Sequence, residues 1–280
     1  MTLVESVHHG SGGAGRTAPA AGGQRPSSSA PPQVSVIVPT YNEVENIPIL
    51  LAHLAEVLVD VDHEVIVVDD DSPDRTWAAV ADLAGHDDRI RLLRRMGTRG
   101  LSSAVVTGMA AARGRALAVL DADLQHDERV LVELVRPVIA GTADVAVGTR
   151  RSAGGSFGSF GPVRRLLSRS GSLLARCLLG VHVSDPMSGY FVLSRERFEH
   201  LVAEVDPSGF KILLEFLVRG PRPRVVEVGY CFGSRRHGES KLTGPVLTAY
   251  LAALLRLFAA RLRRAAGIAR APAVRHRSPN

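Results

Sequence analysis

One stretch of sequence decides the fold: Ala116-Leu117-Ala118-Val119-Leu120-Asp121-Ala122-Asp123-Leu124-Gln125-His126. Its apolar half is typical of a buried strand, and acids at the strand end need partners because burying a carboxylate is costly. Residues two apart in an extended segment point the same way, so Asp121 and Asp123 can grip one divalent cation, with Gln125 as a third oxygen ligand. Mg²⁺ and Mn²⁺ prefer oxygen ligands and often share them with a substrate diphosphate. The alternative is an ordinary polar loop after a strand.

Short apolar runs alternate with helical patterns on both sides of this stretch. We expect strands at 34–38, 64–68, 90–93, 116–120 and 144–147, and helices at 43–59, 74–84, 102–113 and 128–139. Further along, we expect a loop at 152–161, helices at 162–179, 210–218 and 245–264, and strands at 190–193 and 225–230. The alternation predicts an α/β fold with a Rossmann-like, mostly parallel sheet flanked by helices. In such sheets, ligands bind beyond the carboxyl ends of the strands.

Two more polar clusters follow predicted strands, at 39–43 and 69–74, so we expect them to meet the Asp121 cluster at one sheet edge. Tyr41 and Glu43 offer an aromatic face and a carboxylate suited to a base and a ribose. Asp70 can accept hydrogen bonds from either group. The alternative for 69–71 is that these acids form a turn and cap the next helix, and at least one of them has that role. No Gly-x-Gly-x-x-Gly turn follows the first strand, which argues against a dinucleotide-binding fold.

The composition favours anionic partners other than nucleic acid. The chain of 280 residues carries a formal net charge of +6, mostly through Arg. A nucleic-acid-binding surface would interleave basic and aromatic residues, but aromatic residues make up only 5% of this chain. The two cysteines, Cys177 and Cys231, lie far apart in apolar segments, which fits a reducing compartment.

We expect four regions along the chain. Residues 1–33 form a disordered leader rich in Gly, Ser, Pro and Ala, 34–243 the α/β domain, 244–266 an amphipathic helix and 267–280 a disordered basic tail. The segment 245–260 comes nearest to a membrane span, but Arg256 interrupts it. The helices at 162–179 and 244–266 are candidates for contact with a lipid surface, the second through the basic side formed by Arg256, Arg261, Arg263 and Arg264. The alternative is an ordinary helix packed on the domain.

Several motifs occur in one order between Val34 and about Phe258. They lie at 36–43, 67–76, 99–104, 121–126, 147–150, 184–191, 209–213 and 238–242. Together they resemble family 2 glycosyltransferases with the GT-A fold, and more closely the dolichol-phosphate or polyprenyl-phosphate mannose synthases. The most specific are Asp-Ala-Asp-Leu-Gln-His at 121–126 and Gly-Glu-Ser-Lys-Leu at 238–242.

The resemblance implies roles for residues at the matched positions. The nucleotide sugar would be held by Pro39, Tyr41, Glu43, Val68, Asp70, Asp121, Ala122, Asp123, Gln125, Arg235 and Lys241. A Mg²⁺ or Mn²⁺ ion would bind Asp121, Asp123 and Gln125. The catalytic residues would be Asp123, Arg150, Arg164 and Arg235, with the arginines surrounding the phosphates of donor and acceptor. His126 is expected to shape its loop rather than to bind metal, and Lys241 either contacts phosphate or caps a helix.

The implied reaction moves a sugar, foremost mannose from GDP-mannose, onto a polyprenyl or dolichyl monophosphate with inversion to a β-linked product. A prenyl phosphate is already an anionic nucleophile and needs charge neutralisation rather than a general base, a task suited to Arg. Asp185 is the one candidate base, and its other possible role is to orient an Arg. The alternative is another donor, such as UDP-glucose, or a non-lipid acceptor.

The implied partners are the nucleotide sugar, the lipid phosphate and a membrane surface, with a separate membrane-anchoring protein as a further candidate. Nucleic acid is not among them. We expect a cytoplasmic protein that associates peripherally with the cytoplasmic face of the membrane, with C-terminal amphipathic interfacial helices.

Overall fold

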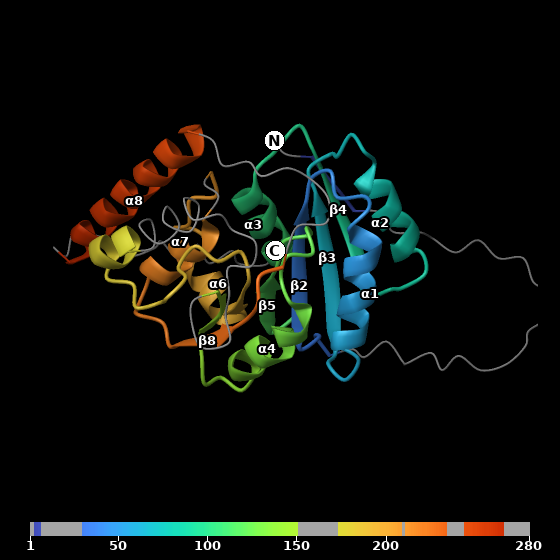
Figure 1. The fold of residues 1–280 in the computed structure, drawn as a ribbon, viewed down its shortest axis with the longest axis horizontal. Coiled ribbons are helices and arrows are strands. Elements are labelled where there is room, and N and C mark those ends of the chain that lie inside the picture. Colours follow the sequence, from blue (N-terminus) through green and yellow to red (C-terminus); the bar gives the residue numbers. More distant parts are fainter. Residues whose placement is uncertain (1–2, 7–29, 151–172, 209–210, 234–243, 266–280) are drawn as a thin grey trace, which may run out of the picture.

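The structure is a computed structural model that describes residues 3–6, 30–150, 173–208, 211–233 and 244–265 (Figure 1). These residues form an eight-stranded sheet in the order β1-β4-β3-β2-β5-β7-β6-β8. The strands are β1 (Leu3–Ser6), β2 (Val34–Thr40), β3 (His63–Asp69), β4 (Ile90–Met96), β5 (Ala116–Val119), β6 (Val145–Thr149), β7 (Phe191–Ser194) and β8 (Val225–Gly229). The helices are α1 (Ile47–Val57), α2 (Thr76–Ala84), α3 (Leu101–Ala111), η1 (Glu128–Val130), α4 (Leu131–Ile139), α6 (Arg195–Leu201), α7 (Ile212–Val218) and α8 (Gly244–Ala265).

The strand directions confirm the predicted mostly parallel sheet. β2 pairs in parallel with both β3 and β5, β3 with β4, and β6 with β8. β7 runs antiparallel between β5 and β6, and β1 runs antiparallel along β4. The carboxyl ends of β2, β3, β5 and β6 therefore point to the same edge, the upper one in Figure 1.

Helices cover both faces of the sheet, and each face has its own apolar core. Alternate strand residues such as Val36 and Val67 pack with α1, α2 and α4 on one face. Their neighbours Ile37 and Val68 pack with α3 and, further along the sheet, α7 and α8 on the other. α3 lies close to the sheet at Gly108, where an added Cβ would come within 2.6 Å of Ile37 Cγ2. The result is a three-layer α/β/α arrangement that holds the polar edge rigid.

Several boundaries differ from those we expected. Helix α1 begins at Ile47 rather than at residue 43, because residues 43–46 form a turn closed by Asn46 N–H donating to Glu43 O. The first turn at 128–130 is a 3-10 helix rather than part of the α-helix, and α6 was not predicted. That helix is short, and it begins where the Ser194 hydroxyl accepts the amide of Arg197.

Within the expected leader at 1–33, the described residues include strand β1. Leu3–Ser6 pair with residues 93–96 of β4, so this part of the segment is not disordered. The reason is that β4 would otherwise present unpaired backbone groups along the sheet edge, and an extended segment satisfies them. The tail at 267–280 lies outside the described residues.

Helix α8 packs on the domain rather than standing apart from it. Leu254 and Leu257 are buried in the core beside α7, while Leu255 and Leu262 are exposed. Arg256, which we expected on a lipid-facing basic side, instead forms an ion pair with Asp206. The reason is that helical geometry turns Arg256 toward an acidic loop of the domain. Across the described part of the chain, we find no helix with both the length and the apolar character that a membrane crossing requires.

Candidate active site

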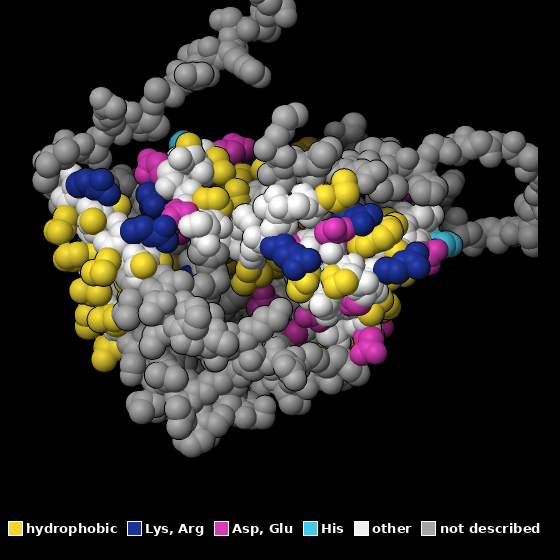
Figure 2. Space-filling view, turned by 90° about the horizontal axis from the view of Figure 1, so that it is seen from above, with side chains coloured by type: hydrophobic (Ala, Val, Ile, Leu, Met, Phe, Trp, Pro, Cys, Tyr) yellow, Lys and Arg dark blue, Asp and Glu magenta, His cyan; other side chains and the backbone are white. Residues whose placement is uncertain are grey.

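The polar ends of the parallel strands meet around a small cavity at the upper edge of the sheet. Figure 2 looks onto this edge and shows acidic side chains around a hollow near the middle of the face. The cavity has a volume of about 190 Å³. Its lining includes Asp121, Asp123, Gln125, His126, Arg150, Gly189, Lys211 and Phe232. The structure therefore places Asp121 and Asp123, after the end of β5, in the same cavity as Arg150.

The two acids are held by a tight turn after β5. Leu124 adopts a left-handed conformation with φ of 56°. The turn lets the amide of Gln125 donate to Asp123 Oδ1 at 3.2 Å. The Gln125 side chain donates through Nε2 to the carbonyl of Gly233 at 3.1 Å, which leaves its Oε1 as the oxygen that a cation would use. Asp123, Gln125 and the segment after β8 thus form one unit.

Asp121 is ionised across the physiological range. Burial opposes its ionisation, but the hydrogen bond from His126 and the positive charges of Lys211 and Arg150 outweigh that cost, so the pKa of Asp121 is lowered. A carboxylate that stays charged beside two cations is suited to bind a metal ion that these groups share with phosphates.

The donor set fits a metal that completes its shell with substrate oxygens. Within the described ranges there is no cluster of three or more His, Cys, Asp or Glu residues that could enclose a metal alone. Two carboxylates and one amide oxygen instead match the way Mg²⁺ is bound, through few protein ligands plus water and phosphate. This donor set is consistent with the expected Mg²⁺ or Mn²⁺ site.

His126 shapes the site through its contacts with Asp121 and with neighbouring aromatic residues. Its Nδ1 lies 2.8 Å from the Tyr230 hydroxyl and its Nε2 lies 3.3 Å from Asp121 Oδ2. The imidazole is surrounded by the rings of Tyr190, Tyr230 and Phe232, with centroid distances of 5.1, 5.5 and 5.6 Å. The expected role in shaping the loop agrees with these contacts.

Arg150 is oriented by Asp185, the residue we considered as a candidate base. Arg150 Nε and Nη2 lie 2.8 and 2.7 Å from Asp185 Oδ2, and the Asp185 side chain is completely buried. The guanidinium also stacks over Phe232, 5.2 Å from the ring centroid. A buried carboxylate committed to an Arg is a poor general base, so the geometry favours the orienting role for Asp185.

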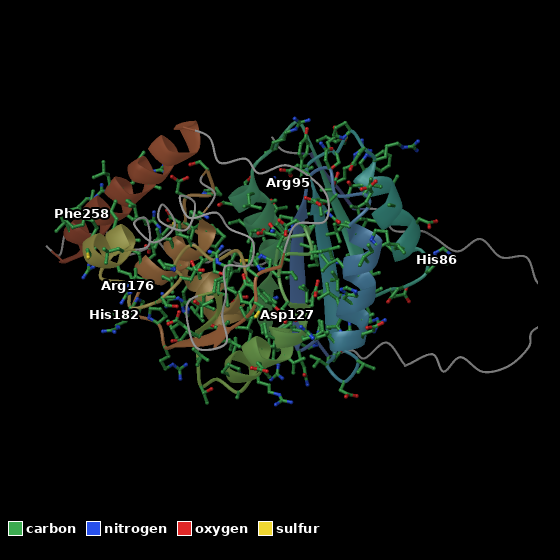
Figure 3. All side chains as sticks on the ribbon, viewed as in Figure 1. His86, Arg95, Asp127, Arg176, His182 and Phe258 are labelled. Atoms are coloured by element: carbon green, nitrogen blue, oxygen red, sulfur yellow. The ribbon has the colours of Figure 1, made fainter. Side chains whose placement is uncertain are left out.

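The nucleoside candidates lie at the ends of β2 and β3. Asp70 does not project freely into the site, because Arg95 Nε donates to its Oδ1 at 2.6 Å and Gly100 N–H donates to its Oδ2 at 2.8 Å. Arg95 lies beside α3 at the same edge (Figure 3) and was missed by the sequence reasoning. The Tyr41 ring is covered by the guanidinium of Arg99, 4.6 Å from its centroid.

Other predicted nucleotide-binding residues contribute through the main chain or hold the turns. The side chains of Pro39, Val68 and Ala122 are buried, so a ligand could reach only their backbone. Asn46 Nδ2 donates to the Glu43 carboxylate at 2.6 Å. The neighbouring Asp69 accepts from Ser72 and Thr40, which confirms the turn-forming role for one of the acids at 69–71.

Three predicted residues, Arg164, Arg235 and Lys241, lie outside the described residues. The structure adds Lys211 to the cavity, a cation for which the sequence offered no specific signal beyond its place in a matched motif. Its Nζ donates to the carbonyl of Met187 at 3.3 Å, and its charge acts on Asp121. Lys211 reaches the site from the turn before α7, far from the acids in sequence.

Comparison with known proteins identifies the family. The model of glycosyl transferase family 2 matches residues 35–202, more than half of the chain. The chain belongs to glycosyltransferase family 2. The matched span of this family 2 glycosyltransferase includes Asp121, Asp123, Arg150 and Asp185. Lys211 and Phe232, which also line the cavity, follow it.

Two curated relatives align with most of this glycosyltransferase chain. A dolichol-phosphate mannosyltransferase from Pyrococcus furiosus is 41% identical over 80% of this chain, and the match spans 63% of that relative's own length. An undecaprenyl-phosphate mannosyltransferase from Micrococcus luteus is 33% identical over 77% of this chain and 89% of its own. The resemblance to dolichol-phosphate mannosyltransferases is therefore confirmed.

A solved structure supports the GT-A fold. Glucosyl-3-phosphoglycerate synthase from Mycobacterium tuberculosis, in complex with Mn²⁺, UDP and glucosyl-3-phosphoglycerate, aligns with a TM-score of 0.55. The alignment covers 86% of this chain and 82% of that structure at 24% sequence identity. At this identity the likeness concerns the fold, and it agrees with the predicted fold class.

Proposed function

We propose that this chain transfers a mannosyl group from a nucleotide sugar, GDP-mannose in the first place, to a polyprenyl or dolichyl monophosphate. One observation carries the proposal: two acids, Asp121 and Asp123, line the same cavity as the cations Arg150 and Lys211. Such a cavity suits a reaction between two phosphorylated substrates, because each group of negative charges then has its own counter-charge. The names of the curated relatives support the same acceptor class.

On the donor side, Tyr41 and the Asp70–Gly100 unit would meet the nucleoside. A Mg²⁺ or Mn²⁺ ion held by Asp121, Asp123 and Gln125 would neutralise the donor diphosphate and assist its departure. The Asp121 carboxylate stays charged for this task because its pKa is lowered. Asp123 is almost fully buried, so its position is set by the turn rather than by solvent.

On the acceptor side, Arg150 and Lys211 would receive the lipid phosphate. A phosphate oxygen attacks the anomeric carbon, the new bond forms between that oxygen and the carbon, and the bond from the carbon to the diphosphate breaks. No proton needs to move, because the nucleophile is already an anion and the leaving diphosphate departs as one. Asp185, already paired with Arg150, orients this cation. Attack opposite the leaving group inverts the anomeric centre and gives a β-linked product from an α-linked donor.

Contact with the lipid surface would come from two helices beside the cavity. Leu255 and Leu262 on α8, and Leu173 in the helical segment 173–179, are 64%, 53% and 60% exposed. Figure 2 shows hydrophobic side chains gathered along α8 at one side of the face that carries the hollow. We propose that these leucines dip into the membrane, so that the enzyme associates with it peripherally and a separate anchoring protein strengthens the contact.

A transfer assay with the purified full chain tests the proposal. GDP-mannose, UDP-glucose and UDP-N-acetylglucosamine are each paired with a short polyprenyl phosphate, in Mn²⁺, Mg²⁺ or EDTA. We expect a lipid-linked mannose only with GDP-mannose and a divalent ion. Product from a UDP sugar alone would favour the alternative donor, and a requirement for a sugar-hydroxyl acceptor would refute the phosphate acceptor. Full activity in EDTA would refute the metal role.

A further inference from the structure

We propose that His126 and Gly189 clamp the Asp121 carboxylate from two sides, with Oδ2 hydrogen-bonded to His126, so that His126 acts as a positioning residue rather than a metal ligand. The inference rests on the proposed function, because it assigns a purpose to the orientation of a metal-binding carboxylate. His126 and Gly189 come from different segments, the loop after β5 and the loop before β7, so the tertiary fold assembles the clamp.

The first side of the clamp is a hydrogen-bonded chain through the imidazole. The Tyr230 hydroxyl lies 2.8 Å from His126 Nδ1, and His126 Nε2 lies 3.3 Å from Asp121 Oδ2. The His126 side chain is only 4% exposed, whereas that of Asp121 is 38% exposed. The donor is therefore buried and rigid, and the carboxylate that it holds projects toward the cavity.

The direction of the hydrogen bonds follows from Asp121. A carboxylate can only accept, so His126 Nε2 carries the proton and donates to Asp121 Oδ2. In that tautomer Nδ1 is the acceptor, and the Tyr230 hydroxyl, 2.8 Å away, is its donor. Tyr230 in this way favours the tautomer that the clamp needs.

The second side of the clamp is the bare backbone of Gly189. A Cβ added there would lie 2.7 Å from Asp121 Oδ2, closer than real contacts allow, and 3.2 and 3.3 Å from its Cγ and Oδ1, which is tight. The reason for glycine at this position is space, since its φ is not among the positive values. Any larger residue would push the Asp121 carboxylate out of the orientation that His126 holds.

The consequence is a preorganised ligand. A carboxylate with one oxygen already bonded needs little reordering when a cation arrives, which strengthens binding. His126 also remains bonded through both nitrogens, so it has no lone pair to offer a metal. The same contacts predict that diphosphate binding in the presence of metal depends on His126.

The test measures Mn²⁺ binding directly, by electron paramagnetic resonance of free Mn²⁺, on the full chain without donor. His126→Phe keeps the ring packing and removes both hydrogen bonds, whereas His126→Gln keeps an N–H donor near the position of Nε2. Tyr230→Phe removes only the hydroxyl that orients the imidazole. His86→Phe, on an exposed residue after α2 (Figure 3), is the matched control.

We expect the Mn²⁺ dissociation constant to rise about 10–100-fold in His126→Phe, as for other residues that orient a metal ligand. His126→Gln should restore most of the Mn²⁺ affinity that His126→Phe loses. The dissociation constant of Tyr230→Phe should lie between those of His126→Gln and His126→Phe, and that of His86→Phe should match the wild type. Gly189→Ala should weaken Mn²⁺ binding with little change in melting temperature. Melting temperatures of all variants establish that they are folded.

Two results would overturn the clamp while leaving the proposed function intact. One is wild-type Mn²⁺ affinity in folded His126→Phe and Gly189→Ala. The other is an equal loss of Mn²⁺ affinity in His126→Gln and His126→Phe. Absence of Mn²⁺ binding by the wild-type chain, with or without GDP, would overturn the metal site itself and the clamp with it.

Discussion

The guanidinium of Arg95 and the carboxylate of Asp70 form an ion pair in which the side chains are only 1% and 8% exposed. The same guanidinium donates to the Gly100 carbonyl at 3.1 Å and to the Ser103 hydroxyl at 3.0 Å. One buried cation thereby joins the end of β3 to the start of α3. The loop that would meet the nucleoside is anchored from inside the protein.

Arg95→Met should destabilise the fold strongly, because it leaves the Asp70 carboxylate buried without its partner. We expect a loss of about 3–5 kcal/mol in the free energy of unfolding. Urea denaturation measures the loss, and the donor KM should rise in parallel. The control is Arg89→Met, which removes an exposed pair with Asp87. A similar, small effect for both variants would contradict the structural importance of the buried pair.

Arg150 and Asp185 should behave as one unit in catalysis. Asp185→Asn and Arg150→Met should each lower kcat/KM for the lipid phosphate about 10–100-fold, and the double variant should be no worse than the poorer single variant. A double-mutant cycle measures this coupling. If Asp185 were instead a general base, Asp185→Asn alone would remove most activity and abolish one limb of the pH–rate profile, while Arg150→Met would leave that limb in place.

Lys211→Met should weaken binding of the lipid phosphate more than binding of the nucleotide sugar. Loss of one charged hydrogen bond to the acceptor should raise the acceptor KM about tenfold, with a donor KM within about twofold of the wild type. Steady-state kinetics with each substrate varied in turn separate the two constants. Arg222→Met removes a cation that follows α7 in sequence and lines a different cavity, and it serves as the control. A selective rise in the donor KM would place Lys211 on the diphosphate instead.

Glu64 should give the protein a distinct acid sensitivity. Burial opposes its ionisation, but hydrogen bonds from Ser35, Arg91 and the Arg113 main chain outweigh that effect and lower the pKa of Glu64. Its contribution is therefore fully present above the unfolded pKa of about 4.3 and is lost as pH falls through the lower folded pKa.

Glu64→Gln should accordingly cost about 2–3 kcal/mol at pH 7, and the difference from the wild type should shrink below about pH 4.3. Urea denaturation across pH 3–8 checks the trend. Glu199→Gln, on a carboxylate that is 60% exposed, should change stability little at any pH. A difference between wild type and Glu64→Gln that stays constant down to pH 3 would show that the charge of Glu64 does not contribute.

The exposed leucines of α8 should determine vesicle binding. Leu255→Glu with Leu262→Glu should lower partitioning onto phosphatidylcholine–phosphatidylglycerol vesicles at least about tenfold, since each buried leucine contributes about 1.5–3 kcal/mol. Co-sedimentation measures the partitioning. Val59→Glu changes a residue that is 56% exposed at the end of α1 and should have no effect. Equal vesicle binding by the wild type, the double leucine variant and Val59→Glu would exclude α8 as the element that binds the membrane.

Local sequence accounts for the parts of the site that come from single segments. The apolar run before Asp121 and the polar residues after Thr40 and Asp69 were enough to place acids and aromatic groups on one edge, because parallel strands end together. Helix α6 and the position of β7 in the sheet could not be predicted from local sequence. The first is too short for a periodic signal, and the antiparallel insertion of β7 between β5 and β6 depends on pairing between distant segments.

The sequence by itself determined the fold class, the acidic pair and the family of this glycosyltransferase, because these depend on patterns within short stretches. Only the tertiary structure decided that Asp70 is neutralised by Arg95, that Asp185 holds Arg150, and that His126, Tyr230 and Gly189 surround Asp121. Each of these pairings joins side chains from separate strands and loops. Such contacts depend on distances of a few ångströms in the packed molecule, which spacing along a chain does not encode.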